Sequence, residues 1–189
     1  MVHWKKEVFT VPNLLSLLRL VLIPVYIRLY LHARDPIGYY TAGGILTLSC
    51  LTDAADGIIA RRFHMISNLG KILDPLADKV TQLAVILSLS LKHTALRPVL
   101  VLFLVKEIFQ LAAGAILLRH RKMLSGALMA GKLCTTVLFT SLILLVLFPQ
   151  IHSNAVNGIA LLDSIFLFVS FLSYGFAYLG NRSCIQDLQ

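Results

Sequence analysis

Residues 53–78 read DAADGIIARRFHMISNLGKILDPLAD, a run in which Asp53, Asp56, Asp74 and Asp78 interrupt an otherwise apolar chain. The whole chain of 189 residues has nine acidic side chains, so four of the nine fall in this one stretch. Carboxylates inside long apolar segments are costly and persist where they pair with a cation, bind a metal or carry chemistry. The stretch therefore predicts a functional site within a membrane-embedded fold.

The spacing of the four aspartates predicts how they are used. On a helix, three residues advance about 300° and four advance about 400°, so Asp53 shares a face with Asp56, and Asp74 shares a face with Asp78. Two helix ends, each with a pair of hard oxygen ligands, suit one or two divalent cations such as Mg²⁺ or Mn²⁺.

Small residues and an arginine lie on the same helix face as the first aspartate pair. Gly57, Ala60 and Arg61 all project within about 80° of Asp53 on a helical wheel. Small residues let a flat ligand approach the backbone, and a guanidinium offers a planar fork to phosphate oxygens. Gly70 again removes side-chain bulk just before the second pair. The pattern is plausible for a nucleotide-diphosphate site.

The composition is that of an integral membrane protein. Hydrophobic residues make up 58% of the chain, charged residues 14%, and the mean hydropathy is +0.82, whereas about a quarter of a soluble domain is charged. The length fits one domain, 1–189. The net charge of +8 reports loop topology and affinity for anionic lipid, and no basic patch interleaved with aromatic residues indicates nucleic-acid binding. Three cysteines with no metal-ligand spacing imply neither a metal site nor a disulfide framework.

The hydropathy pattern predicts an all-α bundle of six transmembrane helices, each near the length of about 20 residues that a bilayer requires. The predicted spans are 13–32, 38–61, 73–92, 97–118, 127–148 and 155–179. Before the first span, residues 1–12 form a short interfacial segment in which Trp4 and Phe9 reach the headgroups and Lys5 and Lys6 meet phosphate.

Basic residues between the spans predict the orientation. Nine basic residues fall on one side of the predicted topology and three on the other. The side with nine carries Lys5, Lys6, Arg61, Arg62, Lys71, Arg119, Arg121, Lys122 and Arg182. The side with three carries Arg34, Lys92 and Arg97. The excess predicts a multi-pass protein with both termini and the aspartate stretch in the cytoplasm.

The aspartate stretch resembles the signature of the CDP-alcohol phosphatidyltransferase family. All eight fixed positions match the pattern Asp-x2-Asp-Gly-x2-Ala-Arg-x8-Gly-x3-Asp-x3-Asp, and six spans with a cytoplasmic motif also agree with that family. Residues 12–19, PNLLSLLR, and 70–79, GKILDPLADK, are similar to the corresponding segments of phosphatidylglycerophosphate synthases and cardiolipin synthases.

The resemblance implies a role for each motif residue. Asp53, Asp56 and Asp74 would bind metal, and Asp78 would act as general base while also facing a second metal ion. The remaining motif residues would hold the CDP moiety, with the cytidine against Gly57, Ala60 and Gly70 and the diphosphate against Arg61.

Lys106 and Lys132 are the candidates for binding an acceptor phosphate. Gly131 precedes Lys132 and suggests a close approach at that point. Compared with the glycerophosphate-using pattern, the chain has Lys106-Glu107 where Arg-Glu is usual, and Cys134 where a second lysine often follows. Lysine binds phosphate as a point charge without the bidentate fork of arginine.

The predicted reaction is transfer of a phosphatidyl group from CDP-diacylglycerol to an alcohol with release of CMP, and the resemblance also implies a homodimer. The favoured acceptor is sn-glycerol 3-phosphate, which would give phosphatidylglycerophosphate. A cardiolipin synthase that uses phosphatidylglycerol is the nearest alternative. An ion or metal transporter and a catalytically silent partner are alternatives of other classes. Arg19, which could line the cavity or snorkel inward, and Asp163, expected at a cap or an interface, have no assigned role.

Overall fold

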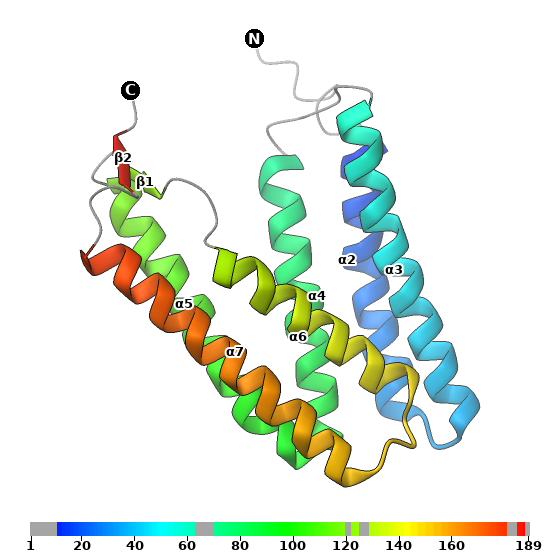
Figure 1. The fold of residues 1–189 in the computed structure, drawn as a ribbon. Coiled ribbons are helices and arrows are strands. Elements are labelled where there is room, and N and C mark those ends of the chain that lie inside the picture. Colours follow the sequence, from blue (N-terminus) through cyan, green and yellow to red (C-terminus); the bar gives the residue numbers. More distant parts are fainter. Residues whose placement is uncertain (1–10, 63–69, 120–121, 125–128, 181–184, 188–189) are drawn as a thin grey trace. The chain divides into compact units, whose positions relative to one another are not determined.

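The computed structural model describes residues 11–62, 70–119, 122–124, 129–180 and 185–187, and the side chains of 13–52, 74–116 and 131–178. Six long helices follow one another in this part of the chain (Figure 1). They are α2 (Val11–His32), α3 (Pro36–Arg62), α4 (Gly70–Lys92), α5 (Arg97–Arg119), α6 (Met129–Leu147) and α7 (Ser153–Gly180). A short 3-10 helix, η1 (Thr94–Leu96), leads into α5.

The helices begin and end within three residues of the limits predicted from the sequence. α2 begins at Val11, so it includes the last two residues of the segment 1–12 that was predicted to lie at the interface. Pro12 therefore belongs to the first turn of α2, where a missing N–H removes no helical hydrogen bond. The other residues of that segment, 1–10, lie outside the described residues.

Three of the helices are long and apolar enough to cross a membrane, judged over the described residues by length and composition. They cover Asn13–His32, Thr94–Ile116 and Ser153–Tyr178, and Gly131–Leu147 is a shorter apolar helix. The aspartate stretch lies at the facing ends of α3 and α4, and its charges lower the hydropathy of both helices. The prediction of six membrane spans stays a prediction.

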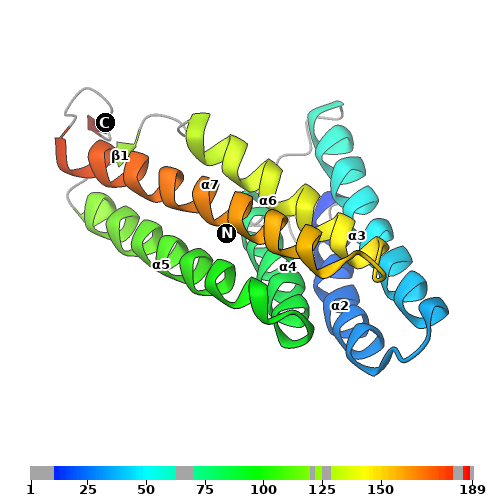
Figure 2. The ribbon, with the colours of Figure 1, turned by 60° about the horizontal axis from the view of Figure 1, so that its bottom comes forward.

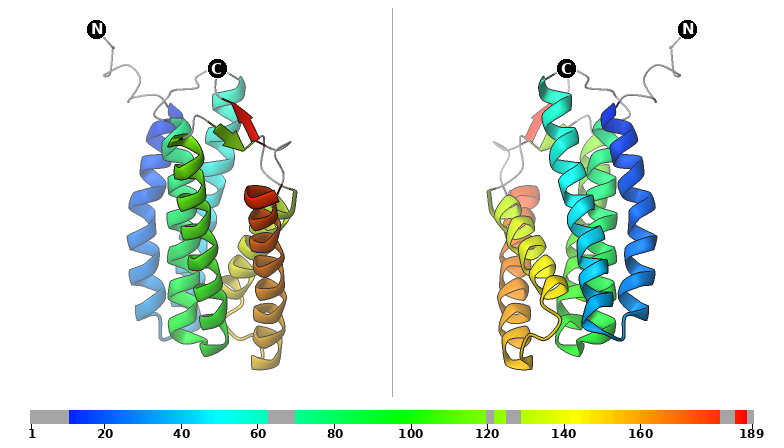
Figure 3. Two further views of the ribbon diagram at one scale, coloured as in Figure 1. Left: turned by 90° about the vertical axis from the view of Figure 1, so that its left-hand side faces the viewer. Right: turned by 90° about the vertical axis from the view of Figure 1, so that its right-hand side faces the viewer.

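The helices form two compact units, one built from residues 1–89 and 143–149 and the other from 90–142 and 150–189. The single domain expected over 1–189 therefore remains a prediction. In the first unit, α2 and α3 run side by side, and α4 packs against α2 (Figures 1 and 3). Pro36 starts α3 at the position where proline costs least.

The core of the first unit lies where α2, α3 and α4 meet. Buried aromatic rings of Tyr26 and Tyr30 stack at 5.7 Å between centroids, and the Tyr26 hydroxyl lies 3.0 Å from Ser88 Oγ on α4. Ala77 on α4 is fully buried. A small residue there lets the neighbouring helix come close.

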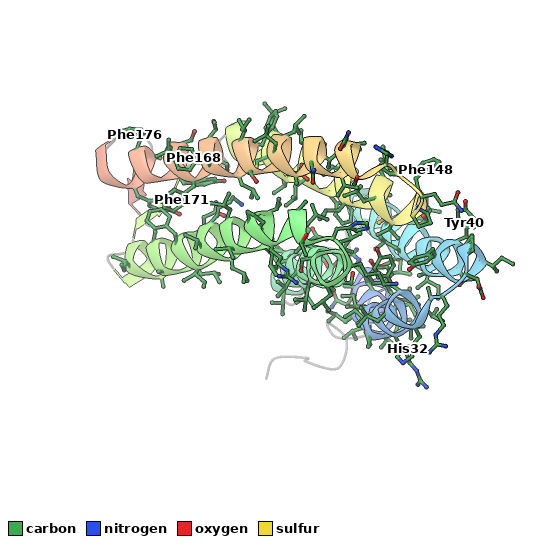
Figure 4. All side chains as sticks on the ribbon, turned by 90° about the horizontal axis from the view of Figure 1, so that it is seen from below. His32, Tyr40, Phe148, Phe168, Phe171 and Phe176 are labelled. Carbon is green, nitrogen blue, oxygen red and sulfur yellow. The ribbon has the colours of Figure 1, made fainter. Side chains whose placement is uncertain are left out.

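The second unit is organised around α5 and α7, which lie alongside each other (Figure 2). Phe109 on α5 meets Phe171 on α7 edge to face, with ring centroids 5.1 Å apart. Figure 4 shows Phe171 between these two helices, whereas Phe176 points away from α5 and is 73% exposed. Strands β1 (Lys122–Leu124) and β2 (Ile185–Asp187) form a short antiparallel pair that the all-α prediction missed.

Candidate active site

The first half of the motif lies on the last turns of α3. The helix is continuous from Pro36 to Arg62, so Asp53, Asp56 and Arg61 follow the helical spacing on which their shared face was predicted. The side chains of residues 53–73 lie outside the described part of the chain, and this includes the predicted CDP-binding positions Gly57, Ala60, Arg61 and Gly70. The roles of these residues stay predictions.

The second half of the motif lies on α4, which begins at Gly70. Asp74 and Asp78 are one turn apart, and each carboxylate has a defined partner on α2. Ser16 Oγ donates a hydrogen bond of 2.5 Å to Asp74 Oδ1. Arg19 Nη1 lies 2.5 Å from Asp78 Oδ1 and forms an ion pair with it. The pair of carboxylates predicted from spacing is therefore fixed against a neighbouring helix.

Arg19 is the residue whose role the sequence left open. Its side chain is only 2% exposed, whereas the Asp78 side chain is 50% exposed. The guanidinium therefore does not snorkel into water; it lies behind the Asp78 carboxylate on the protein side. An available signal was the spacing of Asn13, Ser16 and Arg19, which repeats every three residues and puts three polar side chains on one helix face.

The described donors are of the right kind for a divalent cation. Asp74 and Asp78 supply hard carboxylate oxygens on one side of a helix, and the half-exposed Asp78 can be reached from outside. Among the described side chains no three His, Cys, Asp or Glu residues form a metal-binding group. The predicted four-carboxylate set depends on Asp53 and Asp56, whose side chains are outside that part.

Lys106, a predicted acceptor-phosphate ligand, is a buried residue of α5 in the second unit. Its side chain is 2% exposed, and its Nζ lies 2.8 Å from Oε1 of the adjacent Glu107. Lys106 is thus paired with the next residue of its own helix. A phosphate that binds Lys106 must share the ammonium with this carboxylate.

Lys132, the second predicted acceptor ligand, is exposed on α6. The close approach expected at Gly131 is made by another helix. A Cβ placed on Gly131 would lie 2.8 Å from Cε2 of Tyr174 on α7. The glycine is thus explained by helix packing, and it no longer supports a ligand at Lys132. The binding of an acceptor by Lys132 stays a prediction.

Asp163 lies inside the second unit rather than at a helix cap. The residue is fully buried on α7 and accepts a hydrogen bond of 2.6 Å at Oδ2 from Ser141 Oγ on α6. Its other oxygen, Oδ1, has no hydrogen-bond partner among the described residues. Asp163 therefore lies at a contact between α6 and α7.

The comparison with protein families agrees with the motif. The family model described as CDP-alcohol phosphatidyltransferase matches residues 9–171. The match extends well beyond the aspartate stretch and includes most of both units.

Two curated relatives illustrate the range of names among similar proteins. The chain is 34% identical over 174 residues to the CDP-diacylglycerol--glycerol-3-phosphate 3-phosphatidyltransferase of Aquifex aeolicus, a match covering 87% of this chain and 93% of that protein. It is 35% identical over 118 residues to a cardiolipin synthase (CMP-forming) of Streptomyces coelicolor, covering 60% of this chain and 54% of that protein. The chain belongs to the CDP-alcohol phosphatidyltransferase family.

Proposed function

We propose that the chain transfers the phosphatidyl group of CDP-diacylglycerol to sn-glycerol 3-phosphate, producing phosphatidylglycerophosphate and CMP. The observation that carries this proposal is the match to the Aquifex protein of that name, which covers 93% of that protein and 87% of this chain. The motif supports it, because all eight signature positions are present.

The residues of α3 and the start of α4 hold the donor. Gly57, Ala60 and Gly70 leave room for the cytidine, and Arg61 binds the diphosphate through its planar fork. Asp53, Asp56, Asp74 and Asp78 would hold the divalent ions Mg²⁺ or Mn²⁺, for which their oxygens are suitable ligands. When bound, these ions neutralise charge on the diphosphate and on the departing CMP.

Asp78 acts as the general base. Its carboxylate takes the proton of the acceptor hydroxyl, and the hydroxyl oxygen forms a new bond to the lipid-bearing phosphorus. The bond from this phosphorus to the CMP oxygen breaks, so CMP leaves with the electron pair, and Asp78 later returns the proton to water. The half-exposed side chain of Asp78 suits a base that must meet a mobile acceptor.

The acceptor distinguishes the two candidate reactions. Lys106 and Lys132 would bind the phosphate of glycerol 3-phosphate as point charges. A cardiolipin synthase that takes phosphatidylglycerol is the second candidate, favoured by 45% identity over 83 residues to a putative cardiolipin synthase of Mycobacterium bovis. That match covers only 37% of the relative, so glycerol 3-phosphate is the preferred acceptor.

CMP release by the purified protein tests the proposal. CDP-diacylglycerol is supplied with Mg²⁺ or Mn²⁺, and glycerol 3-phosphate and phosphatidylglycerol are added separately. Asp78→Asn should abolish release, whereas Asp35→Asn, which changes an exposed aspartate outside the motif, should not. Release with glycerol 3-phosphate alone supports the proposal, and release with phosphatidylglycerol alone selects the second candidate. If neither acceptor yields CMP, the proposed acceptor is wrong, and if inositol phosphate and serine also yield none, a silent partner is favoured.

The proposal includes a topology and an assembly. The excess of basic residues predicts both termini and the aspartate stretch on the cytoplasmic side, and the family resemblance suggests a homodimer. Single cysteines placed at Arg34 and at Asn181 in a variant lacking the three native cysteines should label from opposite sides. Crosslinking in vesicles reports the dimer.

A further inference from the structure

A polar stripe runs along the buried face of α2. Asn13, Ser16 and Arg19 are 1%, 0% and 2% exposed, and the same face continues with buried Ile23 and Tyr26. Burying a guanidinium and two other polar groups is costly unless partners satisfy them. The polar part of this face therefore requires partners, and the apolar part does not.

The stripe is aligned with the second half of the motif on α4. The contacts Ser16 to Asp74, Arg19 to Asp78 and Tyr26 to Ser88 occur in rising order on both helices. The two helices therefore run parallel, and Ser16 and Arg19 meet successive turns of α4. Two residues on one face of α2, Ser16 and Arg19, therefore each contact one of the two motif carboxylates on α4.

The burial of the two partners differs in a way that separates their roles. Arg19 is buried at 2% exposure, whereas the Asp78 side chain stays half exposed. The guanidinium holds Oδ1 from the protein side while the carboxylate remains open on the other side. Because Arg19 is buried, its guanidinium does not occupy the open side of the Asp78 carboxylate. It can instead fix the direction in which that carboxylate points.

We propose that Ser16 and Arg19 are positioning residues that orient the carboxylates of Asp74 and Asp78 from α2. This inference rests on the proposed function, in which the two carboxylates bind metal and Asp78 takes the proton. Arg19 makes the stronger contact, because its hydrogen bond to a carboxylate joins two charged groups, whereas Ser16 is a neutral donor. Loss of groups that orient metal-binding side chains lowers activity by about 10–100-fold.

A double-mutant cycle in metal-free protein tests whether the pair acts as a unit. Thermal unfolding is measured for wild type, Arg19→Gln, Asp78→Asn and the double variant. The shift in midpoint caused by Arg19→Gln should fall to less than half when Asp78→Asn is already present. An equal shift in both backgrounds would show that Arg19 stabilises the fold without acting on Asp78, and the proposal would be wrong.

Kinetics on monodisperse protein tests the effect on chemistry. Arg19→Gln should lower kcat by about 10–100-fold and leave KM for CDP-diacylglycerol within about threefold of wild type. Arg19→Lys keeps the charge and should recover part of kcat, and Ser16→Ala should lower kcat less than Arg19→Gln. An unchanged kcat in Arg19→Gln, or no recovery in Arg19→Lys, contradicts the proposal.

Two matched controls use residues of the same kinds. Arg28→Gln removes an exposed arginine from the same helix, and Ser170→Ala removes a buried hydroxyl without a hydrogen-bond partner among the described residues. Both should retain wild-type kcat. If the wild type releases no CMP, the proposed function fails, and the unfolding cycle still decides whether Arg19 and Asp78 are coupled.

Discussion

Replacing Gly131 by alanine should reveal a helix contact between α6 and α7. The new methyl carbon would lie 2.8 Å from Cε2 and 3.0 Å from Cζ of Tyr174, closer than side-chain carbons pack. Tyr174 has little room to move, since its ring is 9% exposed and stacks on Tyr178 at 6.3 Å. Overpacking of this kind costs about 1–3 kcal/mol.

The intrinsic effect of the alanine must be subtracted. Alanine in a helix interior is favoured over glycine by about 0.5–1 kcal/mol. Gly114 on α5 supplies the control, because no described atom lies within 4 Å of a Cβ built there. We therefore expect Gly114→Ala to be stabilising, and Gly131→Ala to be less stable than Gly114→Ala by about 1–3 kcal/mol.

Free energies of unfolding of the purified variants in one detergent provide the measurement. Tyr174→Leu removes the hydroxyl oxygen and the two ring carbons that the new methyl would meet, so Gly131→Ala should cost nothing further in that background. Equal free energies for the two alanine variants would refute the packing explanation. The packing explanation would also be refuted if Gly131→Ala had normal stability but a raised KM for the acceptor. That result would favour a ligand contact at Gly131.

Three further outcomes are expected. Ser141→Ala should destabilise the protein by about 1–3 kcal/mol because it leaves the buried Asp163 carboxyl without its hydrogen bond; Asp163→Asn, which keeps an oxygen acceptor, should cost less in the same unfolding assay. Chelation with EDTA should abolish CMP release without unfolding the protein, since protein groups already hold two of the motif carboxylates, and circular dichroism with Mn²⁺ add-back tests this. Burial, together with the charge of Lys92, lowers the pKa of His93 below 6.5. The unfolded chain therefore binds the proton more readily, so His93 should make the protein less stable as the pH falls below 6.5, and His93→Gln should flatten that fall.

The helices were predictable because each is a long apolar run with a clear end. Pro36 and Gly70 start α3 and α4 close to the predicted limits, and the eight-position motif predicted the family. The pair β1 and β2 was not predictable, because three-residue strands are too short for a periodic pattern.

The partners of the motif were harder to predict than the motif itself. The spacing of Ser16 and Arg19 indicates a polar face on α2, but no pattern within α2 states which helix covers it. The partners lie 58 and 59 residues further along the chain. Gly131 shows the same limit, since a glycine records a close approach without saying whether a ligand or a tyrosine makes it.

The separation between Arg19 and Asp78 has a consequence for biogenesis. Arg19 lies inside the first candidate span, and its partner follows 59 residues later. At a synthesis rate of about 5–20 residues per second, α2 waits about 3–12 s before the ribosome has made Asp78. An arginine at the centre of an inserting helix costs about 2.5–3.5 kcal/mol on the translocon scale, and less near an end. During that interval α2 carries Arg19 without the carboxylate of Asp78, and the synthesis of α4 supplies that carboxylate and completes the described ion pair.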